Sequence, residues 1–214
     1  MTSSSIKKHV FFDVDGVLLF DYHSNPNYRI EWDWDLSKHF QLDILAFNKS
    51  FFGEEGEIYK VITGKRELKD ALQEHLSSAG FVGHVEDFIQ HWHRSASNIN
   101  SKMLDFAKYL SQKNNYQVYI ATNQEVLRAD WLWYELGFKN IFSDIFYSGK
   151  IGHKKPDRAF FMSIQKSLHL DQDNDQMILI DDSRPNIDAA EAVGWGAIHA
   201  WEPQHVFDHM YFKD

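Results

Sequence analysis

The sequence predicts an α/β protein with a doubly wound, Rossmann-like parallel sheet as its core and an inserted α-helical cap domain. Short apolar runs alternate with segments of helical spacing throughout the second half of the chain. The strand signal disappears between Asp21 and about Asn98. Polar residues stand directly after several predicted strands, and ligands bind beyond the carboxyl ends of strands in such sheets. Repeated strand–helix–strand order predicts a parallel sheet with helices on both faces.

The core elements follow one another in a regular order. The first strand enters FFDVDGVLLF at Phe11, and a helical stripe from Met103 to Leu110 precedes the strand in YQVYIATN. A helix that carries Val126, Leu127, Trp131 and Leu132 is expected to end at Gly137 in a left-handed conformation. The remaining predicted elements are the strand IFYS ending at Ser148, a helix over 160–168, the strand MILIDD over 177–182, a helix over 187–192 capped at Gly194, and the strand-like GAIHA.

The segment between the first strand and the second predicts helices only. Leu36, Phe40, Ile44, Phe47 and Phe51 fall near one helical face, and two further stripes run over 68–76 and 85–92. We therefore predict that residues 22–97 form a helical cap. Residues 1–21 and 98–214 are expected to form the catalytic core around it.

Composition limits the classes of partner. The net charge of −9 argues against nucleic acid, because its binding depends on clustered Lys and Arg. The absence of cysteine excludes disulfides and thiolate metal sites, and it fits the cytoplasmic location that we expect. No stretch approaches the roughly eighteen apolar residues of a membrane span, so no membrane partner is expected. The oligomeric state stays open.

Two acids interrupt the apolar stretch FFDVDGVLLF. Burying the carboxylates of Asp13 and Asp15 without partners is costly, so they require a cation, a proton or a chemical use. Other polar residues also stand at or beyond the ends of predicted strands, namely Thr122, Asn123, Lys155, Asp181 and Asp182. Because the carboxyl ends of parallel strands share one edge of the sheet, we expect these side chains to converge.

Four short motifs carry a family resemblance. FFDVDGVLL, IATN, KKPDRAF and IDDSRPNIDAAEAVG stand in this order along the chain. Together they resemble the four motifs of the haloacid dehalogenase-like superfamily of hydrolases, and the resemblance covers essentially the whole chain. The helical insertion lies where one large branch of that family carries its cap.

The carboxylates predict a metal cofactor. Acids that meet at one point repel each other, and a hard divalent cation with oxygen ligands removes that conflict. We expect Mg²⁺, bound by Asp13 and Asp182, and the resemblance adds the backbone carbonyl of Asp15. The adjacent Asp181 leaves open which carboxylate touches the metal, although the spacing to Asn186 favours Asp182. Asp181 and Asn186 are expected to support the ligands.

The same residues predict phosphoryl transfer. Asp13 is the expected nucleophile, and Asp15 would protonate the leaving oxygen and later deprotonate the attacking water. Lys155 and Thr122 would stabilise the transferring oxygens. Gly16 and Asn123 are expected to contact the substrate, and Gly16 also permits the sharp exit from the strand. Dehalogenases of the superfamily lack the second aspartate, because a halide leaves without protonation. Asp15 therefore favours a phosphate ester.

The predicted function is that of a Mg²⁺-dependent phosphatase acting on a small phosphorylated metabolite. Arg29, His91 and Arg94 are candidate substrate contacts from the cap. A closing cap would exclude water and supply specificity. A phosphomutase, which returns the phosphoryl group to a sugar phosphate, stays open as an alternative. So does a non-catalytic phosphate-binding regulatory module.

Overall fold

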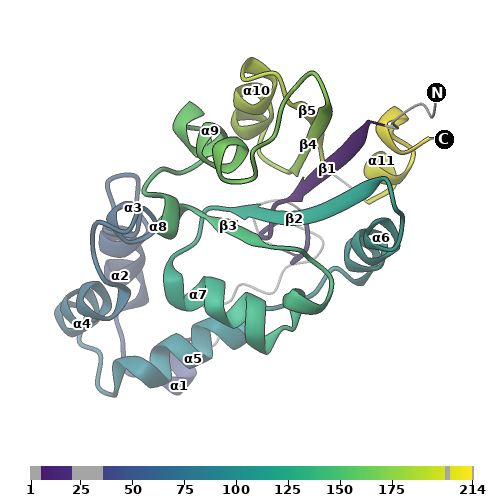
Figure 1. The fold of residues 1–214 in the computed structure, drawn as a ribbon. Helices are drawn as coiled ribbons and strands as arrows, with labels where there is room; N and C mark the ends of the chain where they lie inside the picture. The colour runs from purple at the N-terminus through teal and green to yellow at the C-terminus, as the bar shows by residue number, and fades with distance from the viewer. Residues whose placement is uncertain (1–5, 21–35, 201–202, 214) are drawn as a thin grey trace, which may run out of the picture.

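A five-stranded parallel sheet forms the centre of the computed structural model, which describes residues 6–20, 36–200 and 203–213 (Figure 1). Its strands are β1 (Lys7–Phe12), β2 (Tyr116–Thr122), β3 (Ile145–Tyr147), β4 (Asp175–Asp181) and β5 (Gly196–His199). Their order is β3-β2-β1-β4-β5, and every pairing is parallel. The predicted fold class is confirmed. The strands β2 and β3 are added on one side of β1, and β4 and β5 on the other side. The strand order therefore reverses between β1 and β4, and ligands bind at this point in such sheets.

The three central strands end at the same height. Phe12 pairs with Ile120 of β2 and with Ile180 of β4. The amide of Asp13 then donates to the carbonyl of Ile180 at 2.9 Å, which continues the ladder by one step. The residues after Phe12, Ile120 and Ile180 therefore emerge side by side at the carboxyl edge of the sheet.

Alternate residues of β1 serve the two faces of the sheet, as the period of a strand requires. Val10 and Phe12 pack in one buried cluster with residues of α6 (Ser101–Ser111) and α7 (Val126–Asp130). Phe11 packs in a second cluster with α9 (Arg158–Ser167) and α10 (Arg184–Ala192). Figure 1 shows these pairs of helices on opposite sides of the sheet.

The helix after β2 changes its hydrogen bonding within its length. α7 continues at Trp131 as the π-helix η2 (Trp131–Glu135), and Gly137 then adopts a φ of 74°. The predicted left-handed end at Gly137 is confirmed, as is that at Gly194, with a φ of 86°. The other core elements are α8 (Ser148–Ile151), η3 (Phe138–Asn140), α11 (Pro203–Phe207) and η4 (Met210–Phe212). None of the helices in the described ranges has the length and apolar character of a membrane span.

Within residues 36–95 of the described chain, five helices lie apart from the sheet and enclose a core of their own. They are α1 (Leu36–His39), α2 (Ile44–Phe51), α3 (Ile58–Val61), α4 (Leu68–Ser78) and α5 (Val85–Ser95). The single helical face predicted for Leu36 to Phe51 is wrong, because the chain leaves the helix after His39. Asp43 caps a new helix, and its carboxylate accepts a hydrogen bond from the amide of Ala46 at 3.0 Å.

The chain enters and leaves this helical region at neighbouring points. The amide of Phe20 donates to the carbonyl of Asn98 at 2.8 Å, and that of Asn100 donates to the carbonyl of Leu18 at 2.9 Å. Leu19 and Ile99 form an antiparallel bridge between these bonds. The paired segments flank the predicted cap of residues 22–97, whose boundaries stay a prediction.

Arg128 joins the core helix α7 to the cap helix α5. Its side chain is buried, and its guanidinium donates to the carbonyls of His93, at 2.8 Å, and Ala96. It also donates to the hydroxyl of Ser97 at 3.1 Å. A cation at the carboxyl end of a helix stabilises the helix dipole and satisfies carbonyls that have no helical partner.

Replacing Arg128 with methionine removes the donor to the carbonyl of Ala96 and one of two donors to the carbonyl of His93, which also accepts from the hydroxyl of Ser97. We expect Arg128→Met to lower the free energy of unfolding by about 3 kcal/mol, measured by urea denaturation. Arg158→Met removes the same group from an exposed position at the start of α9 and is expected to change stability by less than about 0.5 kcal/mol. Equal losses in the two variants would show that Arg128 does not hold α5.

Candidate active site

Lys155 lies at the centre of the polar residues that the sheet brings together. Its side chain is fully buried, and its ammonium group donates to Oδ2 of Asp13 at 2.9 Å and to Oδ2 of Asp181 at 2.5 Å. A third bond reaches the carbonyl of Ala121 at 2.8 Å. An ammonium group has three N–H donors, so each one has an acceptor. Lys155 thus ties together the ends of β1, β2 and β4.

Asn123 holds the backbone of Lys155 in place. Its Oδ1 accepts from the amide of Lys155 at 2.8 Å, and its Nδ2 donates to the carbonyl of the same residue at 2.9 Å. This paired contact fixes the loop that carries the lysine against the end of β2. Sequence reasoning assigned Asn123 to the substrate, and that role stays a prediction beside the positioning contact that we describe.

Asp181 is fully buried and is surrounded by donors. Besides Lys155, it accepts from Nδ2 of Asn186 at 2.9 and 3.1 Å and from the amide of Ser183 at 2.9 Å. Asn186 projects from the first turn of α10. The expected role of Asp181 and Asn186 in supporting the metal ligands stays a prediction.

The carboxylates of Asp13, Asp181 and Asp182 form one cluster. Each offers an oxygen, and these oxygens lie within 4.8 Å of one another, close enough to hold a metal ion. Burial raises the pKa of Asp13 well above its ordinary value, Lys155 lowers it, and the charges of Asp181 and Asp182 raise it further. Of the three acids, Asp13 and Asp181 bond to Lys155. An all-oxygen donor set with surplus negative charge fits a hard divalent cation.

The carboxylates in turn hold the charge of Lys155. Burial alone lowers the pKa of its ammonium group, but the charges of Asp13 and Asp181 outweigh that effect and place the pKa above its ordinary value. Lys155 therefore stays cationic at neutral pH.

Gly16 makes a close contact that the sequence did not reveal. Its φ is 82°, and a Cβ atom built there would lie 2.3 Å from Oδ2 of Asp182. Sequence reasoning predicted a sharp turn at Gly16 but could not show which group faces it. The carbonyl of Asp182 accepts a hydrogen bond from Nε2 of His199 at 2.8 Å, which fixes the chain after β4. The two segments therefore need a glycine where they meet.

Gln124 contacts the second aspartate of the first motif. Its side-chain amide donates a short hydrogen bond to Oδ2 of Asp15. Sequence reasoning missed this residue, although it directly follows the motif IATN. Thr122 is buried at the end of β2, where it pairs with Tyr147 of β3. The catalytic roles of Asp13, Asp15, Thr122 and Lys155 stay predictions.

The candidate cap contacts have different surroundings. The ring of His91 in α5 lies 5.0 Å from that of His39 and 5.6 Å from that of Phe40, both in the cap. Arg94 is exposed at the end of α5. Arg29 lies outside the described residues. Contacts of these three residues with substrate stay predictions.

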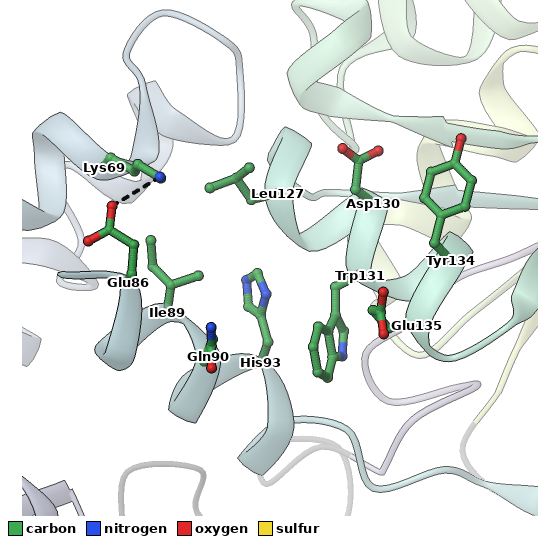
Figure 2. Close-up of a pocket in the computed structure, with 10 residues that line it drawn as sticks. All are labelled: Lys69, Glu86, Ile89, Gln90, His93, Leu127, Asp130, Trp131, Tyr134 and Glu135. Atoms are coloured by element: carbon green, nitrogen blue, oxygen red, sulfur yellow. Dashed lines mark hydrogen bonds and ion pairs between the residues drawn. The ribbon is translucent and has the colours of Figure 1, made fainter. Parts of the chain in front are cut away.

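A pocket of about 300 Å³ lies between α5 and α7 (Figure 2). His93, Leu127 and Trp131 line it, and the ion pair between Lys69 and Glu86 lies on its cap side. His93 is buried, and its Nε2 lies 3.8 Å from Oε1 of Glu125, beyond hydrogen-bonding distance. Burial lowers the pKa of His93, Glu125 raises it, and Arg128 lowers it further.

The fold and the carboxylate cluster define an α/β protein with a candidate catalytic site at its topological switch point. The family model of haloacid dehalogenase-like hydrolases matches residues 7–194. The chain belongs to this family, so the predicted resemblance is confirmed. No curated protein matches the chain.

Solved structures of the same family share the fold. A HAD family enzyme from Bacteroides thetaiotaomicron, in complex with magnesium and inorganic phosphate, is 19% identical with a TM-score of 0.70, over 90% of this chain and 93% of the other. A predicted HAD-like family hydrolase from Porphyromonas gingivalis is 14% identical with a TM-score of 0.66, over 96% and 100%. L-2-haloacid dehalogenase from Xanthobacter autotrophicus, with chloropropionic acid covalently bound, is 12% identical with a TM-score of 0.59, over 90% and 76%.

The contact between Gly16 and Asp182 can be tested against a second glycine with similar backbone geometry. Gly152 has a φ of 80°, and a Cβ atom there would meet nothing within 4 Å. Gly152→Ala should therefore introduce backbone strain alone, about 1 kcal/mol. Gly16→Ala adds a clash with Asp182, and we expect it to cost at least about 1 kcal/mol more in urea denaturation. Equal losses would contradict the close contact.

The lowered pKa of His93 predicts how the stability of the protein depends on pH. Its pKa in the folded protein lies below that of the unfolded chain, so the unfolded chain binds more protons just below pH 6.5. The free energy of unfolding should therefore decrease as pH falls through this range. His93→Phe removes this contribution, and urea denaturation at about pH 7.5 and 5 should show a smaller decrease than in the wild type.

His9 and His209 also have lowered pKa values, but they contribute equally to both proteins. Glu125 and Arg128 are the charged groups that face His93, and both are kept in His93→Phe. His153→Phe, at an exposed histidine, serves as the matched control. A His93→Phe variant with the same pH dependence as the wild type would refute the assignment.

Proposed function

We propose that this protein is a Mg²⁺-dependent phosphohydrolase that cleaves a small phosphorylated metabolite through an aspartyl-phosphate on Asp13. The proposal is carried by the pair of acids that follows β1. Asp13 lies in the carboxylate cluster and bonds to Lys155, while Asp15, two residues on, is held by Gln124. A displaced alkoxide needs a proton, so a second acid beside the nucleophile favours a phosphate ester over an organohalide.

Two aspartates and one backbone carbonyl would hold the metal. The carboxylates of Asp13 and Asp182 are close enough to share an ion, and the carbonyl of Asp15 is the third expected ligand. When bound, Mg²⁺ would supply positive charge to the phosphoryl oxygens and reduce repulsion between them and the carboxylates. The related enzyme from B. thetaiotaomicron, which was solved with magnesium and inorganic phosphate, supports this assignment by analogy.

Asp13 would carry the phosphoryl group. One of its oxygens attacks phosphorus as the bond from phosphorus to the ester oxygen breaks. Its Oδ1 accepts from the amide of Val14 at 2.7 Å, and its Oδ2 from Lys155. These bonds fix the orientation of the carboxylate, and a fixed nucleophile lowers the entropic part of the barrier.

Asp15 would move the proton in both half-reactions. It gives a proton to the leaving ester oxygen, which departs as an alcohol, and becomes a carboxylate. It then takes a proton from the water that attacks phosphorus. The bond from Asp13 to phosphorus breaks, inorganic phosphate leaves, and both aspartates return to their starting states.

The expected activity is release of inorganic phosphate from p-nitrophenyl phosphate in the presence of Mg²⁺, lost on chelation and restored by adding the ion. Asp13→Asn removes the nucleophile and should reduce the rate by at least about 10³-fold. Asp188→Asn changes a carboxylate in the exposed ion pair with Arg184 and should leave the rate within about twofold. Turnover that survives chelation or Asp13→Asn would reject the proposal.

The same preparation separates the alternatives. A phosphomutase would isomerise a sugar phosphate faster than it releases phosphate. A dehalogenase would release halide from 2-chloropropionate. A non-catalytic module would bind a phosphate analogue without turnover on a broad panel of sugar phosphates, nucleotides and small acid phosphates, and that panel would also identify the substrate.

A further inference from the structure

Gln124 is placed to control which oxygen of Asp15 carries the proton. Its side-chain Nε2 donates to Oδ2 of Asp15. An amide N–H can only donate, so the oxygen that it contacts must offer a lone pair. When Asp15 is protonated, the C=O oxygen of the acid is a better acceptor than its O–H oxygen, so this contact favours the proton on Oδ1.

The backbone of Gln124 is anchored on both sides. Its carbonyl accepts from the amide of Gly149 at 3.0 Å and from the buried hydroxyl of Ser148 at 3.3 Å. Glu125, the next residue, caps α7, and its carboxylate accepts from the amides of Leu127 and Arg128 at 2.6 Å each. The Gln124 side chain itself is buried. Because the backbone of Gln124 is anchored and its side chain is buried, the side chain has few alternative rotamers. It can therefore orient a carboxyl group with little loss of conformational entropy.

The loop that carries Gln124 is also packed closely against Gly149. A Cβ atom built at Gly149 would lie 3.0 Å from the carbonyl oxygen of Gln124 and 3.2 Å from the Cα atom of Glu125. The short helix α8 therefore packs directly on the backbone that presents Gln124. Two segments that follow different strands, β2 and β3, fix one side chain.

We propose that Gln124 is a positioning residue for Asp15, which holds Oδ2 of the carboxyl group so that Oδ1 delivers the proton to the leaving oxygen. The inference rests on the proposed function. In this step the bond from Oδ1 to hydrogen breaks, a hydroxyl forms on the departing alcohol, and Gln124 neither gains nor loses a proton. When water later attacks, Oδ1 takes a proton back.

The experiment compares two esters that differ in their need for this proton. The nitrophenolate of p-nitrophenyl phosphate leaves without one, whereas the alkoxide of an alkyl phosphate such as glycerol phosphate requires it. Gln124→Met keeps the length of the side chain and removes the donor. Because kcat/KM reports only the steps up to transfer of the phosphoryl group to Asp13, we expect kcat/KM for the alkyl ester to fall by about tenfold or more, and kcat/KM for the nitrophenyl ester to change by less than about threefold.

Gln117→Met is the matched control, because the same substitution lies at the opposite end of β2. Both rates should stay within about twofold of the wild type. A double-mutant cycle tests whether Gln124 acts through Asp15. In an Asp15→Ala background, adding Gln124→Met should change the residual rate on the alkyl ester by less than about twofold, against about tenfold in the wild-type background, since the group that it orients is gone.

The outcomes separate the two proposals. If the wild type hydrolyses neither ester, the proposed function is wrong and the role of Gln124 is rejected with it. If the wild type hydrolyses both and Gln124→Met slows both by the same factor, only the role of Gln124 is rejected. Additive losses in the cycle also reject it. Should Gln124→Met fail to fold, Gln124→Leu is measured in its place, with the same expected selectivity between the esters.

Discussion

Lys155 supplies the positive charge around which the rest of the site is arranged. Its ammonium group bonds to Asp13, Asp181 and the carbonyl of Ala121, one acceptor from the end of each central strand. A buried carboxylate without a partner costs several kcal/mol. The carboxylates of Asp13 and Asp181 are both buried here, and both have Lys155 as their partner. Lys155 therefore offsets the cost of placing Asp13, after β1, and Asp181, at the end of β4, next to each other. The register of β1, β2 and β4 sets the height of the acceptors, and Asn123 sets the position of the donor.

Lys155 carries one positive charge beside the three carboxylates of the cluster, and on the proposed function Mg²⁺ would balance the remaining negative charge. Asp13 and Asp181 share the lysine, and the charges of Asp181 and Asp182 raise the pKa of Asp13. The backbone of Gly16 lies directly against Asp182, where any side chain would collide. Natural proteins accept clustered like charges and close contacts of this kind mainly at functional sites, and they compensate for the lost stability elsewhere. The apolar clusters on the two faces of the sheet supply the stability that this requires.

Sequence periodicity predicted the sheet and the edge at which the site lies, because buried strands and strand ends leave local signals. The sequence also predicted the left-handed glycines Gly137 and Gly194, because glycine after a helical stripe is a local signal of a helix end. Periodicity failed at two places where the helix depends on its surroundings. Asp43 is the N-cap residue of a second helix within one apolar stripe, and at Trp131 the helix α7 becomes a π-helix. Gln124 and Arg128 escaped notice because their partners are more than thirty residues away in the chain, and no local pattern records such contacts.

The loop after β2 makes contacts both with Asp15 and with the cap. Gln124 holds Asp15 at one end of this loop, and Arg128, one turn into α7, holds the carboxyl end of the cap helix α5. The charges of Asp15 and Glu125 both act on Arg128 and raise its pKa against the larger effect of burial, which lowers it. A second contact lies nearby, since a Cβ atom at Gly64 of the cap would be 2.4 Å from the carbonyl of Gly149, whose amide bonds to Gln124. On the proposed function, a displacement of the cap would act through these contacts on the segment that holds Gln124 against Asp15, and so on the delivery of the proton.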